Sequence, residues 1–375
     1  MNIIITLLIA TLGGAIAHRL GLPIPWLLGS LLIVFFCKKL PIIKAPPKAF
    51  SRWVRVFLGV AIGASVGNTA SNIEPSAVTT LVLSVVFVLT VTFFGVYYFK
   101  RLNNFTTLDS FMSALPGGLT FLFSLSDNLG HRFPKIALIH TVRMVTLILT
   151  FSIFAYFIEH PQHSANTSIL NAIAFTYDSE LWKVIILTLL SGIFAKKCNI
   201  AGGDIMFPII IAASLYHYGV IETPMPEIIK TIAMITFGTV IACKLAISNV
   251  NEFKEQIRAS IIFTIAIISV AFAISLGLGI TFDKHYFLFF LALAPGSIPE
   301  ISLIAIALGY DVGFVAMIHT CRYLFIMLIG ALGFHIFKNK EADGATNIPI
   351  PHSTEIFDSI VKHERENKER EAIGA

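Results

Sequence analysis

The feature of this sequence that most restricts its fold is a series of long apolar stretches separated by short polar breaks. An apolar stretch of about 20 residues is long enough to cross the hydrocarbon core of a bilayer as an α-helix. Hydrophobic residues make up 56% of the chain and charged residues 13%, which is too apolar for a soluble domain of this size. The sequence therefore predicts an all-α, polytopic integral membrane protein whose main solvent is the lipid bilayer.

Ten of the stretches are continuous enough to be predicted as transmembrane helices. They lie near residues 2–18, 22–37, 53–69, 77–98, 133–158, 181–197, 202–220, 226–246, 258–281 and 312–337. Two further stretches, near 109–127 and 285–307, are broken by Pro116-Gly117-Gly118 and by Pro295-Gly296-Ser297. Because Pro interrupts a helix, each of these is predicted to be either one broken helix or a re-entrant hairpin.

Basic residues in the loops predict the sides of the membrane. The loop 38–52 contains five Lys or Arg residues and is expected in the cytoplasm, whereas 70–76 and 159–180 contain none and are expected outside. Arg132 and Lys135 also fit the cytoplasm, which favours two hairpins over twelve full spans and places both termini inside. We expect Asp127 and Lys135 to lie at the membrane interface without a specific role. The net positive charge follows this topology, so no nucleic-acid partner is predicted.

The sequence repeats itself at an offset of 179 residues. At this offset residues 115–150 align with residues 294–329 without a gap, and 10 of the 36 positions are identical. Ile139-His140-Thr141-x-Arg143 falls on Ile318-His319-Thr320-x-Arg322, and Pro116-Gly117 falls on Pro295-Gly296. An apolar bias does not explain paired His and Arg residues, so the chain is predicted to contain two related copies.

The two copies are predicted to have opposite orientations in the membrane. Five spans in each copy is an odd number, and such inverted 5+5 repeats are typical of secondary transporters, whose binding sites lie where broken helices of both copies meet. The offset also places Gly59 on Gly238, whereas the stretch near Pro25 finds only a vague partner near Phe207-Pro208. The predicted organisation is a first membrane repeat over 1–160, an external linker over 161–180, a second, inverted repeat over 181–337 and a polar cytoplasmic tail over 338–375.

Arg143 and Arg322 lie near the middle of predicted spans. A charge at that depth costs at least about 2.5–3.5 kcal/mol, so each should face a wet cavity or a partner. Two guanidinium groups from opposed copies would form an anion-binding centre. The alternative is a structural lock, in which each Arg binds carbonyl groups of a broken helix or a buried carboxylate. His140 and His319, three residues earlier, are predicted to be either proton-coupling groups or helix–helix hydrogen-bond partners.

The two breaks supply the rest of the predicted substrate site, namely Pro116, Gly117, Gly118, Pro295, Gly296 and Ser297. Half-helix N-termini there would offer N–H groups to an anion, the alternative being a kink needed for packing. Glu300 is the one carboxylate in the second broken stretch, and Phe121 is its counterpart. It is predicted to couple transport to protons or sodium, with ion pairing as the alternative. Asp204 is expected to serve as a negative charge at a helix start.

Signatures of enzymes are missing from the sequence. We find no GxSxG, HExxH or Walker-type loop, and the four cysteines have no metal-ligand spacing. A membrane oxygenase would need copper or iron ligands of this kind. We therefore predict no enzymatic activity, no cofactor and no metal site.

Three motifs together give the chain a resemblance to a known family. They are Gly21-Leu22-Pro23-Ile24-Pro25-Trp26-Leu27-Leu28-Gly29, Ala114-Leu115-Pro116-Gly117-Gly118 and Ala294-Pro295-Gly296-Ser297-Ile298-Pro299-Glu300. Over nearly all of residues 1–340 the chain resembles the AbrB membrane-protein family, a duplicated bacterial family distinct from the DNA-binding regulator of the same name. The resemblance implies a multi-pass fold in the bacterial inner membrane. Members are often labelled ammonia monooxygenases or regulators.

The predicted function is secondary transport of a small organic anion, such as a carboxylate or an amino acid, by alternating access. The alternative is a membrane-embedded ligand sensor or regulator of gene expression that acts through a cytosolic partner. Its contact would be the tail, in which residues 354–372 have the pattern of an amphipathic helix. The oligomeric state is left open, with a homodimer as one alternative.

Overall fold

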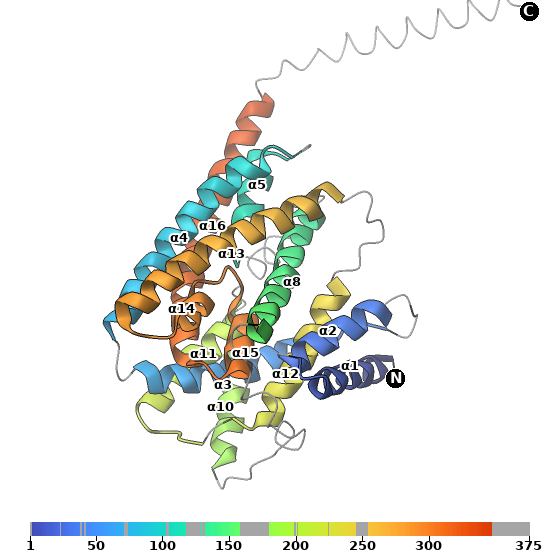
Figure 1. Cartoon of the computed structure of the whole chain (residues 1–375), viewed down its shortest axis with the longest axis vertical. Helices are drawn as coiled ribbons and strands as arrows, with labels where there is room; N and C mark the ends of the chain where they lie inside the picture. The colour runs from blue at the N-terminus through green and yellow to red at the C-terminus, as the bar shows by residue number, and fades with distance from the viewer. Residues whose placement is uncertain are drawn as a thin grey trace, which may run out of the picture. The chain divides into compact units, whose positions relative to one another are not determined.

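The computed structural model describes residues 2–22, 24–37, 40, 43–70, 74–102, 105–117, 129, 132–157, 180–198, 200, 202–223, 225–244 and 254–346. This part of the chain is helical, which confirms the all-α fold class (Figure 1). Its helices are α1 (Asn2–Arg19), α2 (Pro25–Cys37), α3 (Lys48–Ala70), α4 (Pro75–Phe99), α5 (Thr107–Ala114), α8 (Phe133–Phe157), α10 (Leu181–Cys198), α11 (Gly203–His217), α12 (Glu227–Lys244), α13 (Lys254–Phe282), α14 (Tyr286–Leu293), α15 (Ile298–Leu308) and α16 (Val312–Thr346).

Each of the ten predicted spans contains one of these helices. Within the described residues, five helices are long and apolar enough to cross a membrane, namely α3, α4, α8, α13 and α16. The helices α1, α2, α11 and α15 are apolar but shorter. The chain is therefore a helical membrane protein, and the number of its spans stays a prediction.

Both predicted interruptions coincide with helix ends. In the second stretch α14 ends at Leu293, residues 294–297 are not helical and α15 begins at Ile298. In the first stretch α5 ends at Ala114, and residues 118–128 lie outside the described part. The two arms of the second stretch have different neighbours, because α14 packs against α13 and α4 whereas α15 packs against α3 and α12. The side of the membrane from which each stretch enters and leaves stays a prediction.

The helices of the two copies begin at matching positions. Five pairs begin 179 residues apart: α1 and α10 at residues 2 and 181, α3 and α12 at 48 and 227, α4 and α13 at 75 and 254, α5 and α14 at 107 and 286, and α8 and α16 at 133 and 312. The pair α2 and α11 begins at residues 25 and 203, which is one residue less. This pair contains the region where the sequence alone finds only a vague match.

The chain forms two units that are best described separately. Residues 1–330 form one compact unit, and residues 331–375 form the other. The described part of the second unit is the end of α16, which continues past the predicted end of its span at residue 337 up to Thr346. Residues 161–179 of the predicted linker and residues 347–375 of the predicted tail lie outside the described residues.

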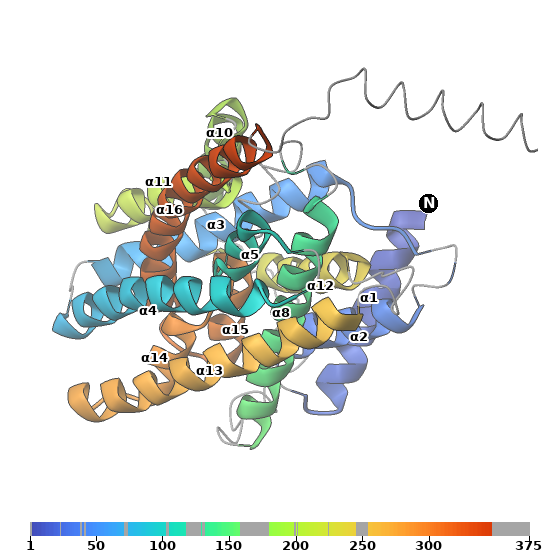
Figure 2. The ribbon, with the colours of Figure 1, turned by 90° about the horizontal axis from the view of Figure 1, so that it is seen from above.

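Helices α4 and α13, which correspond in the two copies, lie side by side and run in opposite directions (Figures 1 and 2). Near the end of α4, the hydroxyl group of Tyr98 donates a hydrogen bond of 3.3 Å to the carbonyl oxygen of Ala259, near the start of α13. Beyond the opposite ends, Lys284 forms an ion pair with Glu74, the residue before α4. The corresponding helices α4 and α13 are therefore antiparallel.

The two copies also exchange neighbours, since α3 packs against α11 and α12 packs against α2. Gly59 on α3 and Gly238 on α12 allow this close approach. A methyl group on Gly59 would lie 2.8 Å from the carbonyl oxygen of Ile205, and one on Gly238 would lie 2.5 Å from that of Leu27. Small residues are typical of close contacts between membrane helices. The two copies thus share one core.

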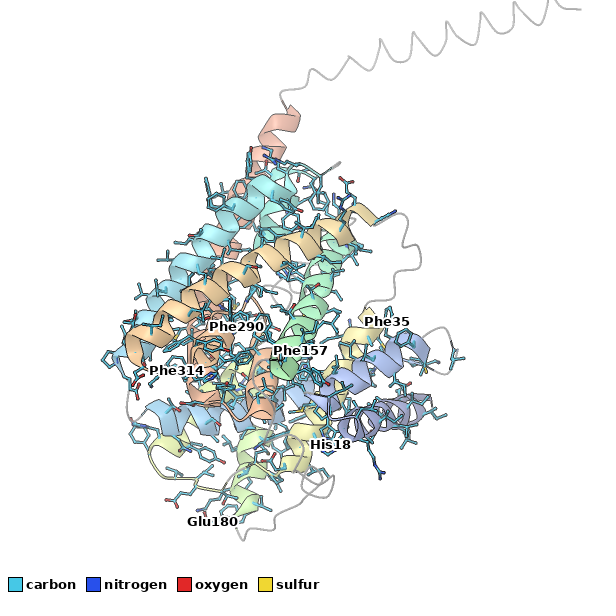
Figure 3. The ribbon with its side chains drawn as sticks, in the orientation of Figure 1. His18, Phe35, Phe157, Glu180, Phe290 and Phe314 are labelled. Carbon is cyan, nitrogen blue, oxygen red and sulfur yellow. The ribbon has the colours of Figure 1, made fainter. Side chains whose placement is uncertain are left out.

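Aromatic side chains fill the space between α8, α13 and α14, around Phe290 (Figure 3). The ring of Phe290 on α14 is centred 4.7 Å from that of Phe151, 5.5 Å from that of Phe154 and 5.3 Å from that of Phe272. Such aromatic pairs each contribute about 0.5–1.5 kcal/mol beyond the area they bury. The half-helix α14 is consequently held firmly inside the bundle, and this fixes the position of its last carbonyl groups.

Candidate functional site

In the first copy, His140 and Arg143 on α8 bind the end of the half-helix α5. Both side chains are buried. One guanidinium nitrogen of Arg143 donates to the carbonyl oxygen of Leu115 at 2.7 Å, and the other donates to that of Ser113 at 3.4 Å. His140 Nε2 lies 2.9 Å from the carbonyl oxygen of Met112. The last carbonyl groups of a helix have no partner within it, and these side chains supply one.

The second copy repeats this arrangement with the offset of 179. His319 Nε2 lies 2.9 Å from the carbonyl oxygen of Leu291, and the side chain of His319 is buried. Buried Arg322 donates to the carbonyl oxygens of Ala294 at 2.7 Å and of Ala292 at 3.4 Å. Each partner is 179 residues after its counterpart in the first copy. The duplication therefore preserves an atomic arrangement as well as a sequence motif.

The hydrogen bonds between Arg and His assign the proton on each imidazole. A terminal nitrogen of Arg143 lies 2.5 Å from His140 Nδ1, and one of Arg322 lies 2.8 Å from His319 Nδ1. A guanidinium group only donates, so Nδ1 must accept. The proton then lies on Nε2, which donates to the backbone carbonyl group. Each His is thus a neutral helix–helix hydrogen-bond partner in this structure, while its role in proton coupling stays a prediction.

The contacts of both arginines include those expected of a structural lock. Each guanidinium group lies where the negative end of a half-helix dipole is found, which favours a positive charge there. Each also ties a full-length helix to the half-helix in front of it. These contacts do not exclude an anion, because a guanidinium group has five N–H donors and a positive charge. The anion-binding role of Arg143 and Arg322 stays a prediction.

The two breaks meet each other. Gly117 has a positive φ of 80°, and a methyl group added to it would lie 2.8 Å from the carbonyl oxygen of Gly296. The same group would be 4.0 Å from Ile326 on α16, and one on Gly296 would be 3.7 Å from Leu147 on α8. Pro116 and Pro295 are buried beside these glycines, and Gly118 lies outside the described residues. The structure thus brings the described parts of both predicted tips to one place.

Glu300 lies in the first turn of α15, next to this meeting point. Its side chain is only 7% exposed, and the hydroxyl group of Ser297, the N-cap residue, donates a hydrogen bond to it. A carboxylate at this position also interacts favourably with the positive end of the helix dipole. Its counterpart Phe121 lies outside the described residues. The predicted role of Glu300 in ion coupling is untested by these contacts.

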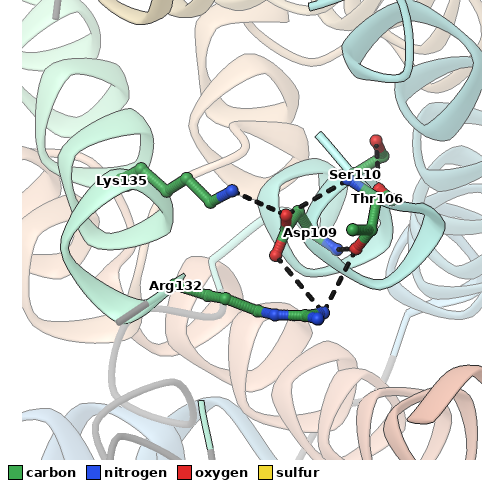
Figure 4. A network of polar contacts seen from close by, with 5 residues as sticks. All are labelled: Thr106, Asp109, Ser110, Arg132 and Lys135. Atoms are coloured by element: carbon green, nitrogen blue, oxygen red, sulfur yellow. Dashed lines mark hydrogen bonds and ion pairs between the residues drawn. The ribbon is translucent and has the colours of Figure 1, made fainter. Parts of the chain in front are cut away.

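Sequence reasoning missed an ion-pair network that Figure 4 shows between α5 and α8. Lys135 Nζ lies 2.7 Å from a carboxylate oxygen of Asp109, whose side chain is fully buried, and Arg132 lies 3.9 Å from the other oxygen. The prediction that Lys135 has no specific role is therefore wrong. Asp109 also forms a capping box with Thr106 at the start of α5. The spacing of Thr106 and Asp109 is a capping signal that the sequence already contains.

Asp204 lies in the first turn of α11, as predicted for a charge at a helix start. It also forms an ion pair with Arg55 on α3, in which Arg55 Nε donates to a carboxylate oxygen at 2.6 Å. This contact joins the two copies and was not predicted. Across the described ranges, no group of three or more His, Cys, Asp or Glu side chains is placed to hold a metal ion. The absence of enzymatic activity and of a cofactor stays a prediction.

Two comparisons place the chain among known proteins. A family model described as "Transition state regulatory protein AbrB" matches residues 26–338, which include both breaks and both arginines. A Bacillus subtilis (strain 168) protein described as "Uncharacterized protein YhjN" is 18% identical over 347 residues, covering 86% of this chain and 89% of that protein. The similarity therefore extends over both copies.

Proposed function

The chain belongs to the AbrB family of membrane proteins, and from this premise we propose that it is a secondary transporter of a small organic anion. The observation that carries the proposal is the meeting of two broken stretches, at Gly117 and Gly296, beside two buried arginines. Transporters with inverted repeats place their substrate at such a point, near the middle of the bilayer. Transport would proceed by alternating access across the bacterial inner membrane.

The inverted arrangement of the copies is supported by the contacts between them. Helices α4 and α13 are antiparallel. At the tips, Gly117 approaches Ile326 and Gly296 approaches Leu147, and the members of these two contacts are related by the offset of 179. Reciprocal contacts of this kind arise from a two-fold axis. If α4 and α13 both cross the membrane, the two copies have opposite orientations in it.

The charges at the centre favour an anionic substrate, such as a carboxylate or an amino acid. The two guanidinium groups and the N-terminus of α15 are positive, and Glu300 is the carboxylate beside them. In our proposal the substrate carboxylate binds N–H donors of Arg143 and Arg322 and backbone N–H groups at the breaks. Arg suits this role because its planar fork matches a carboxylate.

Glu300 is proposed to couple this binding to a proton or a sodium ion. Glu300 is buried at the break. A bound anion there would be close to its carboxylate in a medium of low dielectric constant, so protonating Glu300 would strongly change the electrostatic energy of the anion. His140 and His319 are already hydrogen-bonded to their arginines and to backbone carbonyl groups, so gaining or losing a proton would require these bonds to break. Coupling through Glu300 is therefore the simpler mechanism.

The proposal is tested by transport in vesicles. Solute levels in cells that lack or overproduce the protein would first name candidate substrates, and purified protein would then be reconstituted for counterflow of labelled carboxylates and amino acids. We expect counterflow of at least one such anion, and its loss in Arg143→Ala and Arg322→Ala protein that is still inserted. Normal transport by both variants would refute the anion site.

A second candidate function is suggested by the family description, which names a regulatory protein. In this alternative a ligand binds where the two breaks meet, and the polar tail contacts a cytosolic partner. Deleting residues 340–375 separates the two functions. Intact solute flux together with a lost effect on gene expression would favour the regulator, whereas a lost flux with unchanged expression would favour the transporter.

A further inference from the structure

A groove of about 410 Å³ runs between α4 and α13, away from the centre described above. Its walls are apolar, and Phe94, Ile262 and Val270 along it are exposed. Among the five long apolar helices, α4 and α13 are the two least buried. In a membrane protein this surface faces lipid chains or another protein, because it cannot face water.

One end of the groove is positively charged. Arg101, which lines it, is centred 4.5 Å over the ring of Tyr97 and donates a hydrogen bond of 2.7 Å to its hydroxyl group. Tyr98 lines the same end and binds the carbonyl group of Ala259, whose neighbour along α13 is Arg258. Both arginines are exposed. Arg101, Tyr97 and Tyr98 thus line one end of the apolar groove, and Arg258 is next in sequence to the residue that Tyr98 binds. Such residue types anchor proteins at the headgroup level.

The opposite ends of α4 and α13 differ in charge. There Glu74 and Lys284 form an ion pair with each other, so the two charges neutralise one another. The ends of α4 and α13 at Arg101 and Arg258 therefore have a net positive charge that the other ends lack. Because residues 70–76 are expected outside and residues 77–98 are predicted to span the membrane, the end with Lys100 and Arg101 is expected in the cytoplasm, where the bilayer surface is negative.

From this geometry we propose that the groove binds one anionic phospholipid of the inner leaflet. One of its two acyl chains lies between α4 and α13, and its phosphate group lies at Arg101 and Arg258. The tyrosine under Arg101 holds the guanidinium group at the mouth of the groove, which reduces the side-chain entropy lost on binding. Basic pockets between membrane helices are known to bind such headgroups.

The test is a lipid titration of the purified full-length protein in detergent, with bound lipids counted by native mass spectrometry. Phosphatidylglycerol is compared with phosphatidylcholine of the same acyl chains. We expect one phosphatidylglycerol to bind with roughly thirtyfold preference, since each basic residue near an anionic headgroup contributes about 1 kcal/mol. The variant Arg101→Gln/Arg258→Gln should bind both lipids almost equally.

Two control pairs separate this site from general adsorption. Lys196→Gln/Lys197→Gln removes two exposed charges from the end of α10 and should keep the preference. Ala266→Trp fills the groove and should weaken phosphatidylglycerol binding about tenfold or more, whereas exposed Ala273→Trp, outside the groove, should not. Equal binding of both lipids to the unaltered chain would overturn the proposal. So would a dimer that Ala266→Trp dissociates, because the groove would then hold a second copy.

Discussion

Each copy contains one arginine unit, His140 with Arg143 in the first and His319 with Arg322 in the second. The two units make equivalent hydrogen bonds but differ in how many they make. In both, Arg and His hold the end of a half-helix through carbonyl groups at equivalent positions. Arg322 additionally donates to the carbonyl oxygens of Leu293 and Gly296, both at 3.2 Å. Among the described residues Arg143 has no counterpart of these two bonds. Counted over the described residues alone, the second unit is the more saturated anchor, and the first has more donors left for a substrate.

This difference shows how a duplicated motif can take on two tasks. A guanidinium group that donates to four backbone carbonyl oxygens, as that of Arg322 does, mainly fixes the structure of a break. One with donors to spare can hold a break and still bind an anion. The copies also differ around these units, because Asp109 and Lys135 correspond to Leu288 and Phe314, and Phe121 corresponds to Glu300. The second copy thus has a carboxylate at its break, that of Glu300. The first copy has instead the ion pair of Asp109 and Lys135 between α5 and α8.

The largest loss of stability is expected for the variant Arg322→Ala. It leaves several buried carbonyl groups without a donor, and each buried acceptor left unsatisfied costs about 1–3 kcal/mol. Arg143→Ala should destabilise the protein less, while both variants lose transport. Thermal unfolding in detergent, followed by intrinsic fluorescence, measures the difference. Equal losses of Tm in the two variants would mean that the units are equally saturated.

The next effect concerns the ion pair that only the first copy has. Lys135→Phe introduces the residue of the second copy and leaves the buried carboxylate of Asp109 without its closest cation, which should cost about 3 kcal/mol. The double variant Asp109→Leu/Lys135→Phe copies both residues of the second copy and should recover most of that loss, since no buried charge remains. The Tm values of the single and double variants decide this. If the double variant were as unstable as Lys135→Phe, the pair would be needed for more than charge balance.

Glu300→Gln tests the carboxylate that only the second copy has. We expect transport to lose most of its dependence on pH or on sodium, with substrate affinity changed about twofold or less. Asp204→Asn is the matched control, because Asp204 also lies in the first turn of a helix but is paired with Arg55 on α3. An unchanged ion response in Glu300→Gln would assign Glu300 to structure.

The smallest change in stability is expected for the ion pair between Glu74 and Lys284, which joins the ends of the two copies. Hydrogen bonds from Lys284 and Ser76 lower the pKa of the Glu74 carboxyl group below its ordinary value. This pair therefore stabilises the protein at pH values above the ordinary pKa, and its contribution is lost as the pH falls through the lowered pKa. Glu74→Gln should lower Tm slightly at neutral pH and not at acidic pH. A difference that persists in acid would contradict the ionic explanation.

Much of this fold follows from local features of the sequence. Apolar stretches set the helices, Pro116 and Pro295 mark the breaks, and the paired His and Arg residues reveal the duplication. Each of these signals needs only neighbouring residues or a fixed offset. The match around Pro25 is weaker because α2 and α11 begin one residue out of step and face other helices through apolar surfaces in which many residues are interchangeable.

The unpredicted contacts join residues that are far apart in the chain. Asp109 and Lys135 are separated by 26 residues and Arg55 and Asp204 by 149. The tendency of basic residues to lie in the cytoplasm already accounts for the position of Lys135 in the sequence. The residues near Lys135 in the sequence give no sign that it pairs with a buried carboxylate. The carbonyl groups that Arg143 and Arg322 bind are equally hidden, because every residue has one and only the fold selects which of them lies within reach.

The exchange of neighbours between α3 and α11 and between α12 and α2 has a consequence for how such a protein can arise. Neither copy alone completes its packing, so a half produced by itself would expose the faces around Gly59 or Gly238. In the proposed inverted arrangement, an ancestor with a single copy would have had to insert into the membrane in both orientations. Two molecules of opposite orientation would then have had to associate. Fusion of two such genes would then have fixed each orientation permanently.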